Sequence, residues 1–324
     1  MVGKAALIEL EGVDGTMFTL SGLGMGNRGV ELATDPDGLY DAPVKTILLA
    51  AAFQTGASYG GKRILHRDIV FGVNVFGSKQ VSWEFADSEW RKAWSYDHDC
   101  KLWITTEESR RFLRVRLSEQ PRFKPARDPR LNEYGQVTMT VRAYNPWWWE
   151  DDVTATWTSK TDTQPVDASS ETGHKVEIDT IPVSNPTDNP IWLVWQPQSV
   201  PGAKTLLPDF SWGSDEFERA DEDAERQIWM PAPSIAGQRI LVDTDPEAID
   251  GQVVTFLQAA DGRLGKPNSG EPLWAQMGGI AFVYPLPPYT PEVQVPVGVS
   301  NAPAGWSVQV RCRRPWSRPW GLQS

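Results

Sequence analysis

The stretch QVTMTVRAYNPWWWEDD, residues 136–152, contains the two features that decide the fold of this chain. In its first part Val137, Met139 and Val141 alternate with polar side chains, which is typical of a strand with one face in a core. The aromatic and acidic run that follows Tyr144 ends this strand and marks a domain boundary. We therefore expect strands on both sides of a junction that lies directly after this run.

Short segments with the same character recur along the whole chain and predict a mainly β protein. Each is rich in β-branched or aromatic residues and is bounded by Gly, Pro, Asn or Asp. Before the junction we expect strands over residues 6–10, 16–20, 69–75, 80–85, 102–106, 112–117 and 136–144. After the junction we expect strands over residues 153–157, 175–183, 191–195, 227–230, 239–243, 253–257, 280–284 and 307–311. The second set predicts a β-sandwich or jelly roll.

One segment of the first half has helical rather than strand periodicity. Trp90, Ala93 and Trp94 recur at the spacing i, i+3 and i+4, which places them on one face of a helix. Asp87 or Ser88 can cap the first turn. The sequence therefore predicts one amphipathic helix over residues 88–96, laid on the sheet of the first half.

Length and charge together predict two domains, residues 1–150 and 151–324. A chain of 324 residues is longer than one hydrophobic core usually serves. The first half has 19 basic and 19 acidic side chains and the second half has 12 and 23, so the net charge of −11 lies in the second half. The second domain ends in a proline-rich tail, residues 285–324, which we expect to be extended.

Composition argues against several classes of partner and cofactor. Two cysteines and three histidines are too few for the usual zinc cages, and we expect no metal and no cofactor. The net charge of −11 opposes nucleic-acid binding, which depends on neutralising phosphates. The longest apolar run, Ile47 to Phe53, is too short for membrane insertion. Glu9 and Glu11 interrupt any secretion signal, so we expect assembly in a cytoplasm.

No catalytic motif stands out, and we expect no enzyme activity. The sequence lacks G-x-S-x-G, H-E-x-x-H and the phosphate-binding G-x-x-x-x-G-K-[ST]. Residues 24–29 match G-x-G-x-x-G, but Pro36 and Gly38 interrupt the helix that a dinucleotide site requires directly afterwards. A glycosidase that uses two distant carboxylates remains an open alternative, because no pair can be chosen among 42 acidic residues.

Three groups of residues are candidates for a subunit or partner interface. Trp147, Trp148 and Trp149 are adjacent, so on an extended chain they cannot all enter one core; they either wedge the domain junction or project into a partner. An arginine-rich stretch over residues 110–130 is either a solvated loop or an interface arm. The repeated Arg-Pro-Trp near the C-terminus either closes the protein's own sandwich or clamps a neighbour. The candidates in the last two groups are Arg127, Arg130, Trp316 and Trp320.

Several runs of this sequence resemble the minor tail proteins of siphophages that infect mycobacteria and related actinobacteria. They are GNRGVELATDPDGLYDAPVKT (26–46), GASYGGKRILHRDIVFGVNVFG (56–77), DSEWRKAWSY (87–96), RFLRVRL (111–117) and RPWSRPWGLQ (314–323). The resemblance is collinear over the full chain. Within that group the sequence is most similar to the distal tail protein.

The resemblance implies a first domain of the split β-barrel type found in tail rings, with one helix, followed by a galectin-like or jelly-roll β-sandwich. It implies a virion component that forms a ring, usually a hexamer, between the tail tube protein and the baseplate hub or tail fibres. Other minor tail proteins would then be its partners, and its place would be the virion tail tip.

A carbohydrate-binding tail module is the alternative function. Trp192 or Trp195 on a face of the second domain could stack on host-surface glycans. Because these two residues are three apart, a regular strand would turn one of them into the core. A tail enzyme that degrades the cell wall is a second rival, but the sequence offers no nucleophile or metal motif for it.

Overall fold

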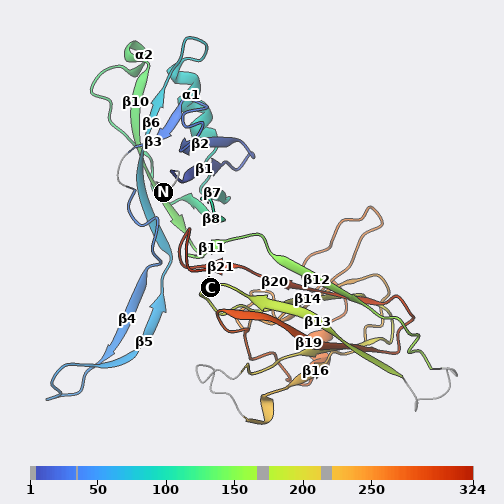
Figure 1. Cartoon of the computed structure of the whole chain (residues 1–324). Helices are drawn as coiled ribbons and strands as arrows, with labels where there is room; N and C mark the ends of the chain where they lie inside the picture. The colour runs from blue at the N-terminus through green and yellow to red at the C-terminus, as the bar shows by residue number, and fades with distance from the viewer. Residues whose placement is uncertain (1–4, 34–35, 166–174, 213–220, 324) are drawn as a thin grey trace. The chain divides into compact units, whose positions relative to one another are not determined.

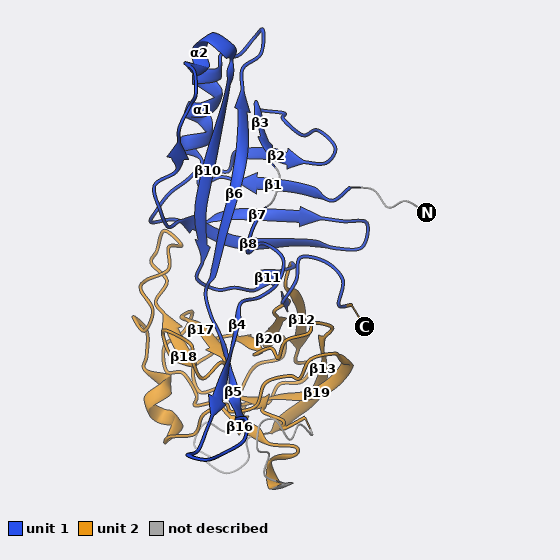
Figure 2. Cartoon of the chain, turned by 90° about the vertical axis from the view of Figure 1, so that its left-hand side faces the viewer, with its two compact units in different colours: residues 1–150, 315–322 blue, residues 151–314, 323–324 orange. Residues whose placement is uncertain are grey.

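The computed structural model describes residues 5–33, 36–165, 175–212 and 221–323, and it divides the chain into two compact units. Unit 1 comprises Met1–Glu150 and Pro315–Leu322, and unit 2 comprises Asp151–Arg314 and Gln323–Ser324 (Figure 2). The chain therefore leaves unit 1 after the tryptophan run and returns to it near the C-terminus. We expected residues 315–322 in the second domain, and the structure instead places them in unit 1.

Unit 1 is built on a nearly closed, barrel-like antiparallel sheet. Its strands follow the order β2-β1-β7-β8-β10-β6-β3, and the two end strands, β2 and β3, contact each other. The strands are β1 (Leu7–Glu11), β2 (Met17–Ser21), β3 (Val30–Leu32), β6 (Arg67–Phe76), β7 (Cys100–Thr105), β8 (Arg110–Leu117) and β10 (Tyr134–Ala143). Three two-residue strands attach to it: β9 (Arg122–Phe123), β11 (Trp148–Trp149) and β21 (Pro315–Trp316). The predicted alternation of β10 is confirmed, because Val137, Met139 and Val141 are all fully buried.

The predicted helix exists but begins earlier than expected. Helix α1 spans Trp83–Lys92, and its cap is Ser82, whose Oγ accepts a hydrogen bond from the Phe85 amide at 3.3 Å. The strand expected over residues 80–85 is wrong, because that segment forms a turn and the first turn of α1. A second short helix, α2 (Pro129–Asn132), lies in the arginine-rich stretch. Among the described residues, no helix has the length and apolar character that would let it cross a membrane.

Unit 2 is a sandwich of two antiparallel sheets around one core. The first sheet has the order β12-β20-β14-β17-β18, and the second has the order β13-β19-β15-β16. Trp195 and Val310 of the first sheet share a single buried cluster with Leu207 and Val297 of the second sheet. The strands are β12 (Val153–Thr158), β13 (Val176–Asn185), β14 (Val194–Pro197), β15 (Lys204–Pro208), β16 (Gln227–Trp229), β17 (Arg239–Asp243), β18 (Val253–Phe256), β19 (Thr290–Ser300) and β20 (Ser307–Cys312). The 3₁₀ turns η2 (Asp221–Asp223) and η3 (Leu273–Met277) lie among the described residues of this unit.

Two sequence expectations for unit 2 need correction. Residues 280–284 form no strand, and the segment expected to be an extended tail contains β19, the longest strand of the chain. Pro291 and Pro296 are compatible with this strand because β15 pairs with it only over residues 298–300. At both prolines β19 therefore has β13 on one side only, where a missing N–H costs little.

A two-stranded hairpin, β4 (Val44–Leu49) and β5 (Ser58–Ile64), forms a sheet of its own in unit 1. Its strands pair from Val44↔Ile64 to Leu49↔Ser58 and extend away from the barrel sheet (Figure 1). Every residue of β4 is exposed. No pattern in the sequence predicted this hairpin, which we call the arm, residues 44–64.

Candidate functional site

Two of the candidate tryptophans are part of the core of unit 1. Trp148 in β11 lies opposite Trp316 in β21, and Trp149 lies opposite both Pro315 and Phe112 of β8. Trp148 is completely buried and Trp316 is 1% exposed. Neither side chain offers a surface to a second protein in this structure, so the interface expectation is corrected for these two residues: their rings fill the core of their own unit.

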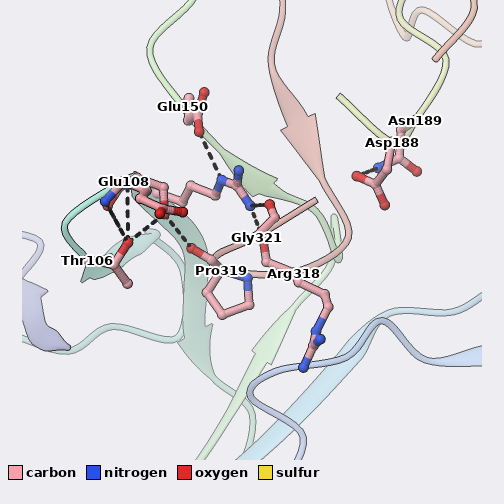
Figure 3. A network of polar contacts seen from close by, with 10 residues as sticks. Thr106, Glu108, Glu150, Asp188, Asn189, Arg318, Pro319 and Gly321 are labelled. Atoms are coloured by element: carbon pink, nitrogen blue, oxygen red, sulfur yellow. Dashed lines mark hydrogen bonds and ion pairs between the residues drawn. The ribbon is translucent and has the colours of Figure 1, made fainter. Parts of the chain in front are cut away.

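A buried arginine fixes the C-terminal segment in this place. Nη1 of Arg111 donates hydrogen bonds to the carbonyl oxygens of Arg318 at 2.9 Å and Gly321 at 3.1 Å, while Nε donates to a carboxylate oxygen of Glu150 at 2.9 Å. Dashed lines in Figure 3 mark these hydrogen bonds at Glu150, Arg318 and Gly321. The guanidinium also lies 3.7 Å from the centre of the Trp316 ring. The Arg111 guanidinium thus connects β8 to Glu150, just before the chain enters unit 2, and to Arg318, just after the chain returns to unit 1.

A second buried arginine, Arg67 at the start of β6, makes a similar set of contacts. Its guanidinium donates to the carbonyl oxygens of Leu39 at 2.8 Å, Pro146 at 3.0 Å and Ser317 at 3.2 Å. Burial lowers the pKa of Arg67 to about 10, which still leaves the group charged at neutral pH. The hydrogen bonds to carbonyl oxygens offset part of the cost of burying this charge.

The remaining tryptophan candidates are half-buried. Trp320 packs against Tyr40 with ring centres 5.1 Å apart, and both rings lie against the core cluster of unit 1. Trp147 and Trp149 are also partly covered. We call residues 315–322 the C-terminal anchor. Self-docking, one of the two alternatives for the Arg-Pro-Trp repeat, is what the structure shows, but the anchor docks on unit 1 rather than on the sandwich.

The two arginine candidates lie on an exposed, basic part of unit 1. Arg127 and Arg130 are exposed, and Arg130 is in α2, which is capped by Asp128 through a 3.1 Å hydrogen bond to the Arg130 amide. Beside them lies a groove of about 530 Å³, whose lining includes Arg122, Lys124 and Arg127. The structure does not bring this groove together with the tryptophan candidates into one site.

The arm presents a group of exposed apolar side chains that no sequence pattern predicted. Its exposed apolar side chains are Val44, Ile47, Leu48, Leu49, Phe53 and Tyr59. Leu48 is 66% exposed, and Phe53 at the tip has no cover at all. Between residues 42 and 65 the sequence contains Lys45, Lys62 and Arg63 but no acidic residue. The only signal in the sequence is the apolar run 47–53, the longest in the chain, whose length excluded a membrane segment but did not indicate a hairpin.

A second hollow of unit 1 lies beside α1. It has a volume of about 600 Å³, with Val81, Phe85 and Glu89 in its lining. Phe85 is 57% exposed although it lies in a helix. Glu84, on the first turn of α1, is exposed nearby. We call this the α1 hollow. Its lining also contains one charged residue of each sign, Glu89 and Arg28, whereas the arm has charged side chains of positive sign only.

Sequence comparisons relate the whole chain to tail proteins of mycobacteriophages. Minor tail protein Gp27 of Mycobacterium phage L5 is 34% identical to it, and the alignment covers 98% of each protein. Minor tail protein Gp27 of Mycobacterium phage D29 is 35% identical with the same coverage. No family model matches the sequence.

Structure comparisons show a shared fold. The crystal structure of the Dit protein (gp 19.1) of phage SPP1, described as a paradigm of the hub adsorption apparatus in phages that infect Gram-positive bacteria, aligns with a TM-score of 0.54. That alignment covers 96% of this chain and 99% of the other, at 11% identity. A chain of the phage P2 baseplate in its activated, Ca-bound conformation aligns with a TM-score of 0.50, 11% identity and coverage of 96% and 98%.

Proposed function

Since this chain belongs to the family of the minor tail protein Gp27 of mycobacteriophages, a component of the virion tail, we propose that it is the distal tail protein that closes into a ring at the tail tip. The ring, six copies in our proposal, joins the tail tube to the baseplate hub or tail fibres. The shared fold with the Dit protein of SPP1 and with the phage P2 baseplate chain supports this assignment. The role is structural, without catalysis, in keeping with the tail components that it resembles.

The observation that carries the proposal is the exposed arm. A monomeric protein rarely leaves several large apolar side chains together on a projecting hairpin, because their burial stabilises by about 25 cal/mol for each Å² removed from water. The strands of the arm also have edges with unpaired backbone groups, which favour association with another chain. We propose that a second copy of this chain covers the arm.

The α1 hollow is the surface that best complements the arm. The arm offers Phe53 and Leu48, and the hollow offers Phe85 and Val81, so the match is mainly apolar. Charge adds to it only at Glu89, which lines the hollow together with Arg28, and at Glu84, which is exposed on α1. An arm that enters the hollow of the next copy makes a heterologous contact, since the two surfaces differ. Repetition of such a contact closes a ring when the rotation between neighbours fits a whole number of copies.

The other predicted interface residues are then left for different tail proteins. The basic groove beside Arg127 and Arg130 does not complement the basic arm, so we assign it to the tail tube protein or the baseplate hub. The balanced charge of residues 1–150 limits repulsion when copies meet, whereas the acidic residues 151–324 keep the assembly soluble.

The mass of the purified full chain in solution tests this proposal. Light scattering should give about six times the 36.1 kDa of one chain, and negative-stain images of the same fraction should show rings. The double variant Leu48→Ser/Phe53→Ser should shift the mass to that of one chain at the same concentration. The exposed double variant Ile178→Ser/Ile249→Ser, which lies in unit 2 outside both the arm and the α1 hollow, is the control and should keep the ring. A monomeric wild-type protein at every concentration tested would contradict the proposal.

A further inference from the structure

Unit 2 contains a hollow that neither the fold nor the proposed ring explains. Its volume is about 510 Å³, and its lining includes Asp250, Asn268, Trp274 and Ile280. The Trp274 side chain is 59% exposed, more than that of Trp229, the other exposed tryptophan described in unit 2, at 42%. The tryptophans that the sequence analysis nominated for stacking are poorer candidates, because Trp195 is completely buried and Trp192 is half-buried.

The backbone that carries Trp274 is anchored to the core of the sandwich. Trp274 lies in η3, where the flanking Leu273 and Met277 are buried in the core of the sandwich. The Leu273 amide donates to the Glu271 carbonyl at 2.8 Å, and the Ile280 amide donates to the Met277 carbonyl at 3.1 Å. A ligand that stacks on this indole therefore does not first have to order the backbone that carries it.

Polar groups with spare hydrogen-bonding capacity surround the indole. The amide nitrogen of Asn268 donates to the Asp250 backbone carbonyl at 3.2 Å, which connects the two loops. Within the described residues, no hydrogen bond or ion pair engages the Asp250 carboxylate, the Asn268 amide oxygen or the Trp274 indole N–H. The hollow thus offers two acceptors and one donor beside an exposed aromatic face.

The geometry points to a binding site for neutral pyranose glycans in this hollow. The apolar C–H face of a pyranose stacks on an exposed indole, and carboxylate and amide oxygens accept hydrogen bonds from its hydroxyl groups. The lining has no lysine or arginine but contains Asp250, and the second half of the chain is strongly acidic. Uronic acids and phosphorylated sugars would therefore be repelled. This site goes beyond ring formation and does not depend on it.

Saturation-transfer NMR on the full-length protein tests the site, because it detects the weak binding expected of a single sugar. The probes are methyl β-galactopyranoside and methyl β-glucopyranoside at millimolar concentration, with methyl β-glucuronide as the charged control. We expect transfer to the ring protons of at least one neutral sugar, and none to the glucuronide. Trp274→Ala should remove at least four fifths of the signal, and Asp250→Asn should weaken it.

Trp229→Ala is the matched control, because Trp229 is also an exposed tryptophan of unit 2, at 42%, but does not line the hollow. It should leave the signal unchanged, and the melting temperatures of all variants should match that of the wild type. No transfer to either neutral sugar, or a signal that survives Trp274→Ala, would overturn the proposal. Neither result would bear on the mass of the ring.

Discussion

The arm and the C-terminal anchor are both short apolar segments of unit 1, but the fold buries one and exposes the other. The anchor contains Trp316 and Trp320, and its sequence alone is compatible with an exposed segment that binds another protein. Its own unit nevertheless covers it, through strand pairing and the buried guanidinium of Arg111. The arm has no tryptophan, yet its Leu48 and Phe53 remain in solvent.

The difference shows that apolar composition does not by itself identify an interface. What separates the two segments is whether the fold supplies partners for their backbone and side chains. The carbonyl oxygens of the anchor are satisfied by Arg67 and Arg111. The arm pairs only with itself, and its side chains lie outside the core cluster. Changes in the anchor should therefore act on stability, and changes in the arm on assembly.

Trp316→Ala should have the largest effect on stability. It removes a buried ring from the core of unit 1, so we expect a loss of about 3–5 kcal/mol in the free energy of unfolding. Calorimetry should show the transition of unit 1 at a lower temperature, with the transition of unit 2 retained. Trp229→Ala, which removes an exposed tryptophan, is the control for loss of an indole. An unchanged first transition would show that the anchor does not hold unit 1 together.

Arg111→Met should cost less, about 2–3 kcal/mol, because it leaves the Glu150 carboxylate and two carbonyl oxygens without their charged donor. Denaturant unfolding measures this loss. Arg114→Met is the matched control on the same strand, since the Arg114 side chain is exposed, and it should change stability by about 0.5 kcal/mol or less. Equal effects of the two substitutions would contradict a special role for the buried guanidinium.

Trp320→Ala should have a smaller effect, because Trp320 is only half-buried. Its ring packs on Tyr40 at 5.1 Å, so a double-mutant cycle with Tyr40→Leu should give a coupling energy of about 0.5–1.5 kcal/mol. Additive effects of the two substitutions would mean that this contact does not hold the end of the anchor.

Replacing residues 46–62 of the arm by a short glycine linker should have the smallest effect on stability. The segment covers no part of the core, and we expect a change within about 0.5 kcal/mol. The same variant should fail to assemble in light scattering, which none of the exposed control substitutions should cause. A large loss of stability would show that the arm supports its own unit, as the anchor does.

The sequence predicted the parts of the fold that depend on local pattern. The alternation in residues 136–144 predicted β10, and the spacing of Trp90 and Trp94 predicted a helix, although Ser82 begins it earlier. The return of residues 315–322 to unit 1 depends on pairing with β11, more than 160 positions away in the chain, which no local pattern contains. The exposure of the arm likewise could not be predicted, because it depends on whether distant segments of the chain pack against β4 and β5.

The candidate interface was predicted less well for the same reason. Arg127 and Arg130 are exposed, as a partner surface requires, but Trp148 and Trp316 are buried in the core of unit 1. Tryptophan is enriched both in interfaces and in cores, so its presence could not separate the two roles. In the sequence, Phe53 and Leu48 belong to the apolar run 47–53, and nothing in that run indicates that they are exposed.

The measurement that tests this account most directly is photo-crosslinking from the tip of the arm. A photoreactive phenylalanine at position 53, in the full chain assembled into rings or tails, should join two copies of this chain, and peptide mapping should place the crosslink near Phe85 in α1. The same group at the exposed position Leu131 is the control and should not give that product. Absence of the two-copy product from position 53, or crosslinks only to other tail proteins, would contradict the claim that the arm holds the ring together.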